Sequence, residues 1–502
     1  MRAKDNHKYY YYTVLVFIGL MYFPRLTDYG LFMDGSIYGA VSHNMALGDG
    51  SFWSPVFHNP YALQGVKPPI FYEHPPLMYW MESWFFRLFG DGFWVEGLYG
   101  TVILVLHILV LTFFYRMLTA RKFSIYAAWP VILLWYSVPS ISWSFPENML
   151  DNSLSLWALL SVMVVFVSVR RDHFLWAVLG GILMGLAVLV KGPLGFFPLA
   201  SIGLYWLASL WTQAKGFRYP FFRALYKTVA FAFGFAIVGV NLYILPEARE
   251  FMSRYLYQQV IPSVLGQREM DNSWSSHLSI LQDVVVEYAP VYMFALFLWV
   301  VFRLRKKRRD TGLPLISLSE KNRGRFSLWL FLVWLSATLP IALSAKSHSF
   351  YLISGVPYLA LSVGVFWAKD LDEWVLNWSL SKFKQRVWAS VLVLVVLGVG
   401  FQVWSHWGEY KRDKALFMDL ELLAQKRPAR HHVGFLPEVK EWPTLHSNLE
   451  RYLLIQTHPD WTKQKIVIAR VATDSIYLDS LAQKKYEPLS GDWQAFRVFV
   501  RH

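Results

Sequence analysis

The 502-residue chain is too apolar and too poor in charge for a soluble protein of its size. Hydrophobic residues make up 55% of it and charged residues 16%, and its mean hydropathy is +0.32. A soluble domain carries about 25% charged residues, so this composition excludes a soluble multidomain enzyme and a disordered chain. The 24 Trp and 28 Tyr are typical of many membrane interfaces. We therefore expect a polytopic α-helical membrane protein with some soluble part.

The charge and cysteine content narrow the possible chemistry. A net charge of +14 fits basic cytoplasmic loops and contact with anionic lipid or a phosphate-bearing substrate. The chain has no cysteine, which excludes disulfides, cysteine zinc sites, iron–sulfur clusters and cysteine nucleophiles. It also lacks the G-x-x-x-x-G-K-[ST] pattern of a cytoplasmic ATP site, so no nucleotide is expected, and neither is a nucleic acid partner.

Apolar runs along the chain predict the membrane spans. The first run follows Arg2 and Lys4 without a small-residue cleavage site, as in an uncleaved signal-anchor. A span needs roughly 17–25 residues, and on this basis we expect about eleven transmembrane helices. Their approximate limits are 9–25, 95–118, 125–141, 150–169, 174–190, 193–211, 227–245, 288–303, 326–344, 350–367 and 386–404.

Basic residues fall on alternate connections between these spans. Examples are Arg121 with Lys122, Arg170 with Arg171, and the run 303–309, which we interpret as a topology signal without chemistry. The positive-inside rule places these connections and the N-terminus in the cytoplasm, so we expect a multi-pass membrane protein. The remaining connections and the C-terminal tail would then face the periplasm.

The long periplasmic segments divide the chain. A transmembrane domain, 1–404, would carry loops at 26–94 and 246–287, each with an interfacial juxtamembrane helix; in the first loop the helix is expected at 75–89. The tail, 405–502, contains strand-like runs at 465–469 and 496–500, which predict a small soluble α/β domain.

Acidic residues near the outer face are candidates for chemistry. Asp34 fits a general base tuned by burial, or a helix N-cap. Glu73 and His74 precede a helix that Pro75 and Pro76 would start; there they fit a phosphate or metal-bound phosphate, or ordinary helix initiation.

Glu147 and Asp151 open the fourth span. They are four residues apart and therefore share one helix face. Two acids without a local cation at a membrane boundary indicate substrate or metal contact. The alternative is helix capping and compensation of the helix dipole.

Basic residues converge on the same face. Lys191 lies in a Lys-Gly-Pro bend, where it would bind a lipid phosphate or extend to the interface. Together with the acids, it would belong to a basic rim that also includes Arg249, Arg254, Arg268, Lys346 and His348, with Tyr351 starting the next span.

Five motifs in order make the chain resemble the GT-C glycosyltransferases, in the bacterial branch related to protein O-mannosyltransferases and to the aminoarabinose and galacturonic acid transferases of lipid A. The resemblance covers about residues 9–370. It rests on Asp34, on His74-Pro75-Pro76-Leu77-Met78-Tyr79-Trp80 with Leu88-Phe89-Gly90, on Asp151, on Lys191-Gly192-Pro193, and on Lys346 with Tyr351-Leu352 and Pro357. The chain differs from the family in having Gly35 where Glu is frequent and His74 where the family has Lys.

The resemblance implies a GT-C fold and transfer of a sugar, with inversion, from a polyprenyl phosphate donor. The acceptor would be a hydroxyl or phosphate of lipid A, another envelope glycan or a protein. If the C-terminal domain only selects acceptors, a chain ending at about residue 404 should keep some activity. Asp34 would be the base, with Asp151 also catalytic. Donor and acceptor would contact Tyr79, Glu147, Tyr351 and the basic rim, and a divalent metal on Glu73, His74 or Asp151 stays open as a cofactor.

Three other hypotheses use the same features. One is a flippase or transporter of a lipid-linked saccharide, although we find neither internal repeats nor clear mid-membrane polar residues. Another is an O-antigen-ligase-like transferase that uses a pyrophosphate donor. The third is an inactive relative that acts as a scaffold through its tail.

Overall fold

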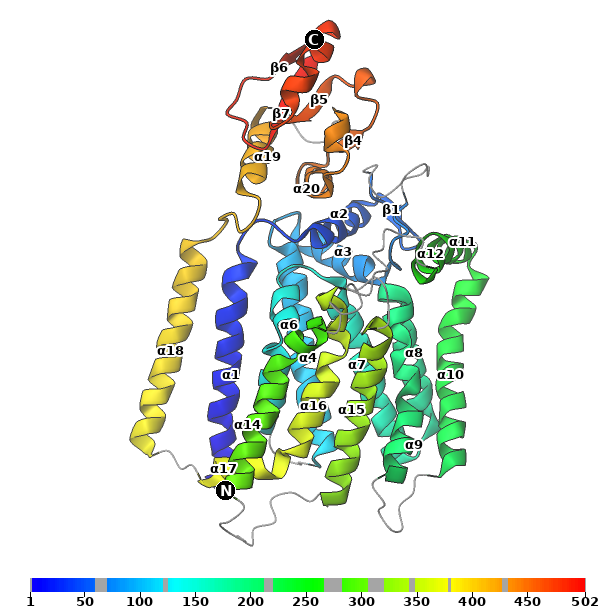
Figure 1. Cartoon of the computed structure of the whole chain (residues 1–502), viewed down its shortest axis with the longest axis vertical. Helices are drawn as coiled ribbons and strands as arrows, with labels where there is room; N and C mark the ends of the chain where they lie inside the picture. Colours follow the sequence, from blue (N-terminus) through cyan, green and yellow to red (C-terminus); the bar gives the residue numbers. More distant parts are fainter. Residues whose placement is uncertain are drawn as a thin grey trace.

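The computed structural model describes residues 2–58, 70–120, 125–211, 220–265, 282–305, 320–342, 348–377, 381–426 and 432–501. Long helices form a bundle, and a small domain containing a β-sheet stands on one end of it (Figure 1). We call this end the upper face, as it is drawn. The N-terminus lies at the opposite end.

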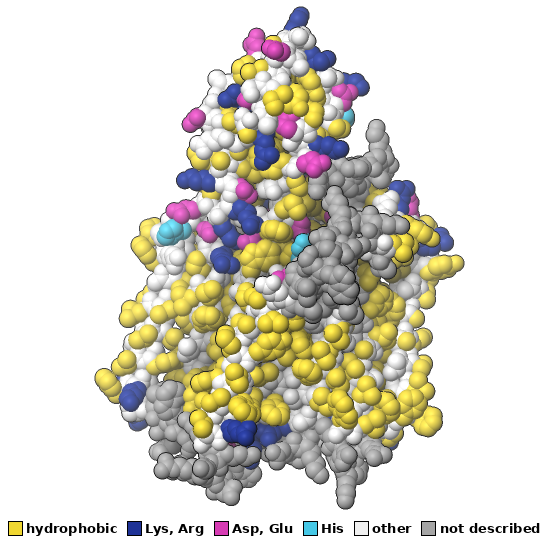
Figure 2. All heavy atoms as spheres, viewed as in Figure 1, with side chains coloured by type: hydrophobic (Ala, Val, Ile, Leu, Met, Phe, Trp, Pro, Cys, Tyr) yellow, Lys and Arg dark blue, Asp and Glu magenta, His cyan; other side chains and the backbone are white. Residues whose placement is uncertain are grey.

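The chain is a multi-pass membrane protein. By length and composition, six segments of the described residues can cross a membrane, and three shorter apolar helices accompany them. A broad hydrophobic band covers the visible face of the bundle, with charged side chains gathered above and below it (Figure 2). The bundle helices are α1 (Arg2–Leu26), α4 (Val95–Leu118), α5 (Trp129–Tyr136), α6 (Pro139–Ser144), α7 (Leu150–Arg171), α8 (Phe174–Lys191), α9 (Ser201–Trp211), α10 (Phe221–Ile244), α14 (Ala289–Arg305), α15 (Glu320–Ala342), α16 (Val356–Phe366) and α18 (Lys382–Ser405).

Three expected spans are less regular than predicted. Span 125–141 stops at Tyr136 and resumes at Pro139, because proline lacks the N–H that a helix interior needs. Span 193–211 begins with the 3₁₀ segment η3 (Gly192–Ala200), and span 350–367 begins with η5 (Ser349–Ser354). A short helix that was not expected, α17 (Ala368–Asn377), lies at the lower end, where Asp372 pairs with His7 of α1 at 3.1 Å.

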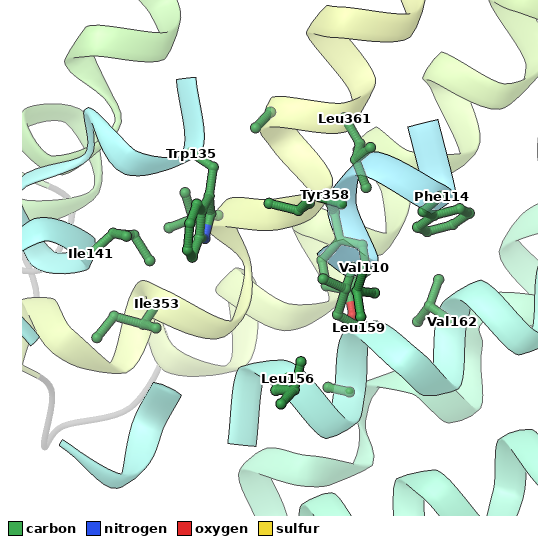
Figure 3. Packing of buried hydrophobic residues seen from close by; sticks show 14 of the residues in the cluster. Val110, Phe114, Trp135, Ile141, Leu156, Leu159, Val162, Ile353, Tyr358 and Leu361 are labelled. Carbon is green, nitrogen blue, oxygen red and sulfur yellow. The ribbon is translucent and has the colours of Figure 1, made fainter. Parts of the chain in front are cut away.

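Aromatic packing holds the bundle together. Trp135 of α5 and Tyr358 of α16 are fully buried in one hydrophobic cluster. Tyr358 lies beside Val110 of α4 and Leu159 of α7, whereas Trp135 lies on the side of Ile141 and Ile353 (Figure 3). In lipid, such close packing replaces the hydrophobic effect as the force between helices. The upper ends of these helices therefore form a stable base for the residues above them.

Short helices cover the upper face. The helix expected at 75–89 is confirmed as α3 (Leu77–Phe89), and the second long loop begins with the helical segments α11 (Pro246–Tyr255), η4 (Leu256–Val260) and α12 (Ile261–Val264). The sequence analysis did not predict α2 (Met33–Leu47), which is mostly buried under the sheet domain, nor the small hairpin of β1 (Gly50–Ser51) and β2 (Ser54–Pro55).

The C-terminal region is a small mixed α/β domain, as predicted. Its sheet has the order β4-β3-β5-β7-β6, in which β4, β3 and β5 are parallel and β7 is antiparallel to both of its neighbours. Hydrophobic clusters pack on both faces of the sheet. The elements are α19 (Lys414–Lys426), β3 (His432–Phe435), η6 (Pro437–Val439), α20 (Pro443–Leu453), β4 (Gln456–His458), η7 (Trp461–Lys463), β5 (Ile466–Arg470), η8 (Asp474–Tyr477), α21 (Leu478–Gln483), β6 (Tyr486–Pro488) and β7 (Phe496–Arg501).

Candidate active site at the upper face

Asp34 lies in the first turn of α2. The N-cap residue of this helix is Phe32, and no side chain caps it, so the N-cap interpretation of Asp34 is wrong. A carboxylate in the first turn is favoured by the helix dipole. Asp34 is half-buried. The structure thus presents an acid at the boundary between the bundle and the upper loops.

Two buried tyrosines stand next to Asp34. Burial raises the pKa of Tyr38 well above its usual value, and the charge of Asp34 adds to this shift. For Tyr79, of α3, burial is again the main cause of the raised pKa, followed by Glu73 and Asp34. The Tyr79 hydroxyl is buried without a hydrogen-bond partner among the described residues. A polar group left without a partner in a buried place points to a ligand or water that would bind it.

The segment before α3 closes the wall around these tyrosines. The ring of Tyr38 packs edge-on against His74 at 5.8 Å and lies 5.7 Å from the Tyr79 ring. Glu73 and His74 are half-buried and precede α3, whose first residue is Leu77. The structure therefore brings Asp34, Glu73, His74 and Tyr79 into one neighbourhood.

A buried ion pair joins the fourth and fifth spans. The Lys191 Nζ donates to both carboxylate oxygens of Asp151 at 2.6 Å, and the two side chains are 5% and 1% exposed. No cation is close to Asp151 in sequence, as the sequence analysis noted, and its partner in the structure comes from forty residues further along the chain. Lys191 also lies 4.3 Å from the ring centre of Tyr351 and 5.5 Å from that of Phe350.

This ion pair and Asp34 belong to one neighbourhood. The charges of Asp34 and Asp151 both act on the Tyr38 hydroxyl, as does Tyr351. His348, which is exposed, lies within electrostatic range of Asp151. Residues from four separate elements, α2, α7, α8 and the start of η5, therefore converge below α3.

The bend after Lys191 is fixed by close packing. Gly192 has φ +72°, and a Cβ at this position would lie 2.0 Å from the Tyr255 hydroxyl oxygen. This hydroxyl donates to the Lys191 carbonyl at 3.4 Å. A side chain at position 192 would thus be strained in its backbone and would clash. The expected tight turn is confirmed, and it holds the end of α8 against α11.

Both carboxylate oxygens of Glu147 are bound by other groups of the protein. Its side chain is 3% exposed, one oxygen pairs with Lys411 of the C-terminal region, and the other accepts from the Phe32 backbone N–H at 2.7 Å. This residue therefore connects α2, the fourth span and the C-terminal region. Its predicted contact with substrate stays a prediction, which these contacts do not favour.

The rim arginines lie apart from the buried pair. Arg249 is exposed and lies 5.5 Å from the ring centre of Tyr243. Arg254 pairs with Glu250 at 2.9 Å and lies 5.4 Å from the ring centre of Tyr72, the residue before Glu73. Arg254 is thus the rim arginine that borders the site. Arg268 and Lys346 lie outside the described residues.

The metal candidates do not form a preformed site. Within the described ranges, no group of three or more His, Cys, Asp or Glu side chains could hold a metal ion. Of the three candidates, Asp151 has both oxygens bound to Lys191, and Glu73 with His74 makes only two. The residues present therefore do not fit a metal-binding cluster.

Several buried residues near the site were not predicted. Glu82 of α3 is fully buried and accepts from the Ser42 hydroxyl at 2.6 Å, and Arg451 of α20 pairs with the buried Glu96. Tyr255 contributes the contact at the Lys191 bend. Each of these contacts joins residues from different elements, so no local pattern in the sequence indicates them.

Comparison with known protein families gives one match to part of the chain. The family model described as dolichyl-phosphate-mannose-protein mannosyltransferase matches residues 73–253. An uncharacterized protein of Aquifex aeolicus (strain VF5) is 23% identical over 403 residues, which cover 77% of this chain and 68% of that protein.

Solved structures match nearly the whole chain. ArnT from Cupriavidus metallidurans, crystallised with undecaprenyl phosphate, is similar with a TM-score of 0.59 and 17% identity, and the match covers 97% of both chains. The apo oligosaccharyltransferase of Archaeoglobus fulgidus is similar with a TM-score of 0.50 and 14% identity, over 96% of this chain and 73% of that one. At such identities these likenesses establish the fold.

Proposed function

The chain has the GT-C glycosyltransferase fold in its ArnT-like form, and from this premise we propose that it is an inverting glycosyltransferase. It moves a sugar from a polyprenyl phosphate to an acceptor hydroxyl or phosphate in the cell envelope. Lipid A, another glycan and a protein are the acceptor classes considered. The observation that carries this proposal is the convergence of Asp34 with the buried Asp151–Lys191 pair around Tyr38.

Asp34 is the general base in this mechanism. It lies half-buried at the start of α2, close to the Tyr79 hydroxyl, which has no hydrogen-bond partner in the part of the chain that the structure describes. We infer that the acceptor hydroxyl binds here. The carboxylate takes the acceptor proton as the acceptor oxygen attacks the anomeric carbon of the sugar. The new carbon–oxygen bond forms on the face opposite the bond to phosphate, so the configuration inverts.

The leaving group is the polyprenyl phosphate, which receives the electron pair of the broken carbon–oxygen bond. Charge that develops on its oxygens is stabilised best by a cation already in position. Lys191 is such a cation, because Asp151 and the Tyr351 ring orient its ammonium group within a buried site. Arg254, at the border of the site beside Tyr72, adds a second positive charge. Each step uses only side chains of this chain.

A lipid-linked donor fits the position of the site. The site lies at the upper membrane boundary, where the head of a membrane lipid would be. The undecaprenyl phosphate bound to ArnT supports the same class of donor. With the positive-inside orientation, this boundary is the periplasmic side of a bacterial inner membrane.

The test is transfer by Asp34→Asn, which keeps the shape of the side chain and removes its basicity. Glycolipid and glycoprotein fractions are analysed by mass spectrometry from cells with wild-type protein or variant at equal membrane levels. We expect one glycan to lose a single sugar mass and the polyprenyl phosphate sugar to accumulate. The mass would also identify the sugar.

Asp28→Asn is the matched control. Asp28 lies six residues before Asp34, just after the upper end of α1, and has no part in the proposed mechanism. Its variant should therefore transfer sugar normally. Normal transfer by Asp34→Asn would contradict the role of Asp34 as base. A change in the distribution of the lipid-linked sugar between leaflets, with no missing sugar mass, would instead favour the transporter hypothesis.

A further inference from the structure

A cavity of about 310 Å³ lies between the bundle and the C-terminal domain. One wall is the end of α2 and the loop after it, with Asn44, Asp49 and His58. The opposite wall belongs to the C-terminal domain, with Glu450 at the end of α20 and Gln456 on β4. The cavity therefore forms only where the two parts of the chain meet.

This cavity is separate from the candidate active site. Asp34 and Asn44 lie ten residues apart on α2, which at 1.5 Å per residue is about 15 Å. A molecule in the cavity would thus be close to the reacting atoms without touching them. With its volume, the cavity is at the small end of ligand-binding pockets in proteins.

The lining residue Glu450 has one buried carboxylate oxygen without a hydrogen-bond partner among the described residues. The Glu450 side chain is 1% exposed, and its Oε1 accepts from the Asn44 Nδ2 at 2.5 Å and from the His58 backbone N–H at 2.8 Å. Its Oε2 is buried without a hydrogen-bond partner among the described residues. Such a group costs free energy in the folded protein unless something binds it. Glu450 is one of the residues that line the cavity, so a molecule bound there is a candidate partner for its carboxyl group.

The lining favours a neutral ligand with hydroxyl groups. The described residues of the wall include no lysine or arginine, so no permanent cation favours an anion there. Two histidines line the wall: His58, whose ring bonds the Asp49 carboxylate, and the exposed His432. Burial raises the pKa of Glu450 to about 8, so near pH 7 this carboxyl keeps a proton and can donate as well as accept. Leu47 and Leu454 add apolar surface beside these polar groups.

We propose that the cavity binds a neutral sugar residue. A sugar ring carries hydroxyls that both donate and accept, which matches the carboxyl of Glu450 and the amide of Gln456. Its C–H faces match the two leucines. The protein would thus hold a saccharide between its two parts, apart from the site of transfer.

Binding is tested on the full-length protein in detergent, without any donor, so the result does not depend on whether the protein transfers sugar. The probes are glucose, galactose, mannose and N-acetylglucosamine, and saturation-transfer NMR measures their binding. We expect at least one of them to bind. Binding of none would overturn the proposal, as would binding of glucosamine or inorganic phosphate alone.

Two variants and a control locate the binding. Leu47→Trp fills the cavity from an exposed position and should abolish binding, whereas Leu88→Trp, on the exposed end of α3, should not change it. Gln456→Ala should weaken binding about tenfold, as expected for one lost hydrogen bond. Unchanged binding by Leu47→Trp or Gln456→Ala, with wild-type thermal unfolding, would show that the sugar binds elsewhere.

Discussion

The Ser447 hydroxyl of α20 lies 2.6 Å from the Ser36 hydroxyl of α2, a hydrogen bond across 411 residues of sequence. Ser36 is two residues after Asp34, so the C-terminal domain contacts the same helical turn as the proposed base. Four residues further along α20, Arg451 pairs with the buried Glu96 and donates to the Gly92 carbonyl at 3.0 Å. The C-terminal domain therefore holds α2 in place.

Removal of the C-terminal domain should abolish transfer. From the sequence, we expected a chain ending at residue 404 to keep some activity. The structure predicts the opposite, because the truncation leaves Glu96 without its cation, Glu147 without Lys411 and α2 uncovered. Transfer is measured in membranes after protease mapping has confirmed insertion. A correctly inserted truncation with near wild-type transfer would show that α2 keeps its place unaided.

The buried Asp151–Lys191 pair makes separable predictions for stability and activity. Lys191→Met and Asp151→Asn should each destabilise the protein by about 3–5 kcal/mol, because each leaves an unpaired or poorly satisfied partner buried. The double variant removes both charges and should regain most of the stability. Thermal unfolding in detergent measures this recovery.

Transfer activity should not follow that recovery. If Lys191 stabilises the leaving phosphate, the double variant stays inactive although its stability is near that of wild type. Its transfer rate should fall more than about a hundredfold, which is the usual effect of losing one preorganised electrostatic contact to the transition state. Recovery of transfer together with stability would mean that the pair is purely structural.

These two residues also show how far the sequence could predict the site. Asp151 and Lys191 were each identified, from their positions at span ends and from the family resemblance. Their pairing was not, because it depends on the packing of α7 against α8 after the chain has folded back. Likewise, Glu147 looked like a contact for substrate, and its partner Lys411 lies 264 residues later.

The fold was more predictable than the contacts. Apolar length identifies spans, and short runs rich in β-branched and aromatic residues identified the strands at 465–469 and 496–500. The helix α2 was missed because it is mostly buried, carries no capping side chain and lacks strong amphipathicity. Its placement comes from α20, which no local pattern reveals.

Glu82 predicts a pH dependence of stability. Burial and the neighbouring Glu96 raise its pKa from 4.5 to about 8, so between these values the folded protein binds more protons than the unfolded chain. Stability contributed by this group is therefore full below about pH 4.5 and is lost as pH rises to about 8. Glu82→Gln should remove this part of the decline, worth a few kcal/mol at most.

The measurement is the midpoint of thermal unfolding in detergent between pH 5 and 8.5. Glu82→Gln should gain stability relative to wild type toward the alkaline end, whereas Glu487→Gln, at an exposed position on β6, should follow wild type throughout. Parallel curves for Glu82→Gln and wild type would mean that Glu82 ionises normally in the folded protein.

Gly35 should be intolerant of any side chain. A Cβ at this position would lie 2.0 Å from the Glu147 carbonyl oxygen and 3.0 Å from its carbon, both backbone atoms that cannot swing away. The Asn148 side chain also donates to the Gly35 carbonyl at 3.3 Å, so α2 is held against the entry to the fourth span. A glutamate, which is frequent at this position in the GT-C glycosyltransferases that the chain resembles, would not fit this packing.

Gly35→Ala should therefore move the first turn of α2 and shift Asp34, the residue beside it. We expect a loss of about 1–3 kcal/mol in stability from overpacking and a larger proportional loss of transfer. Gly203→Ala is the matched control, because nothing lies within 4 Å of its added Cβ and alanine favours the helix α9. If both alanine variants transfer sugar like wild type, the close approach of α2 to Glu147 does not position the base.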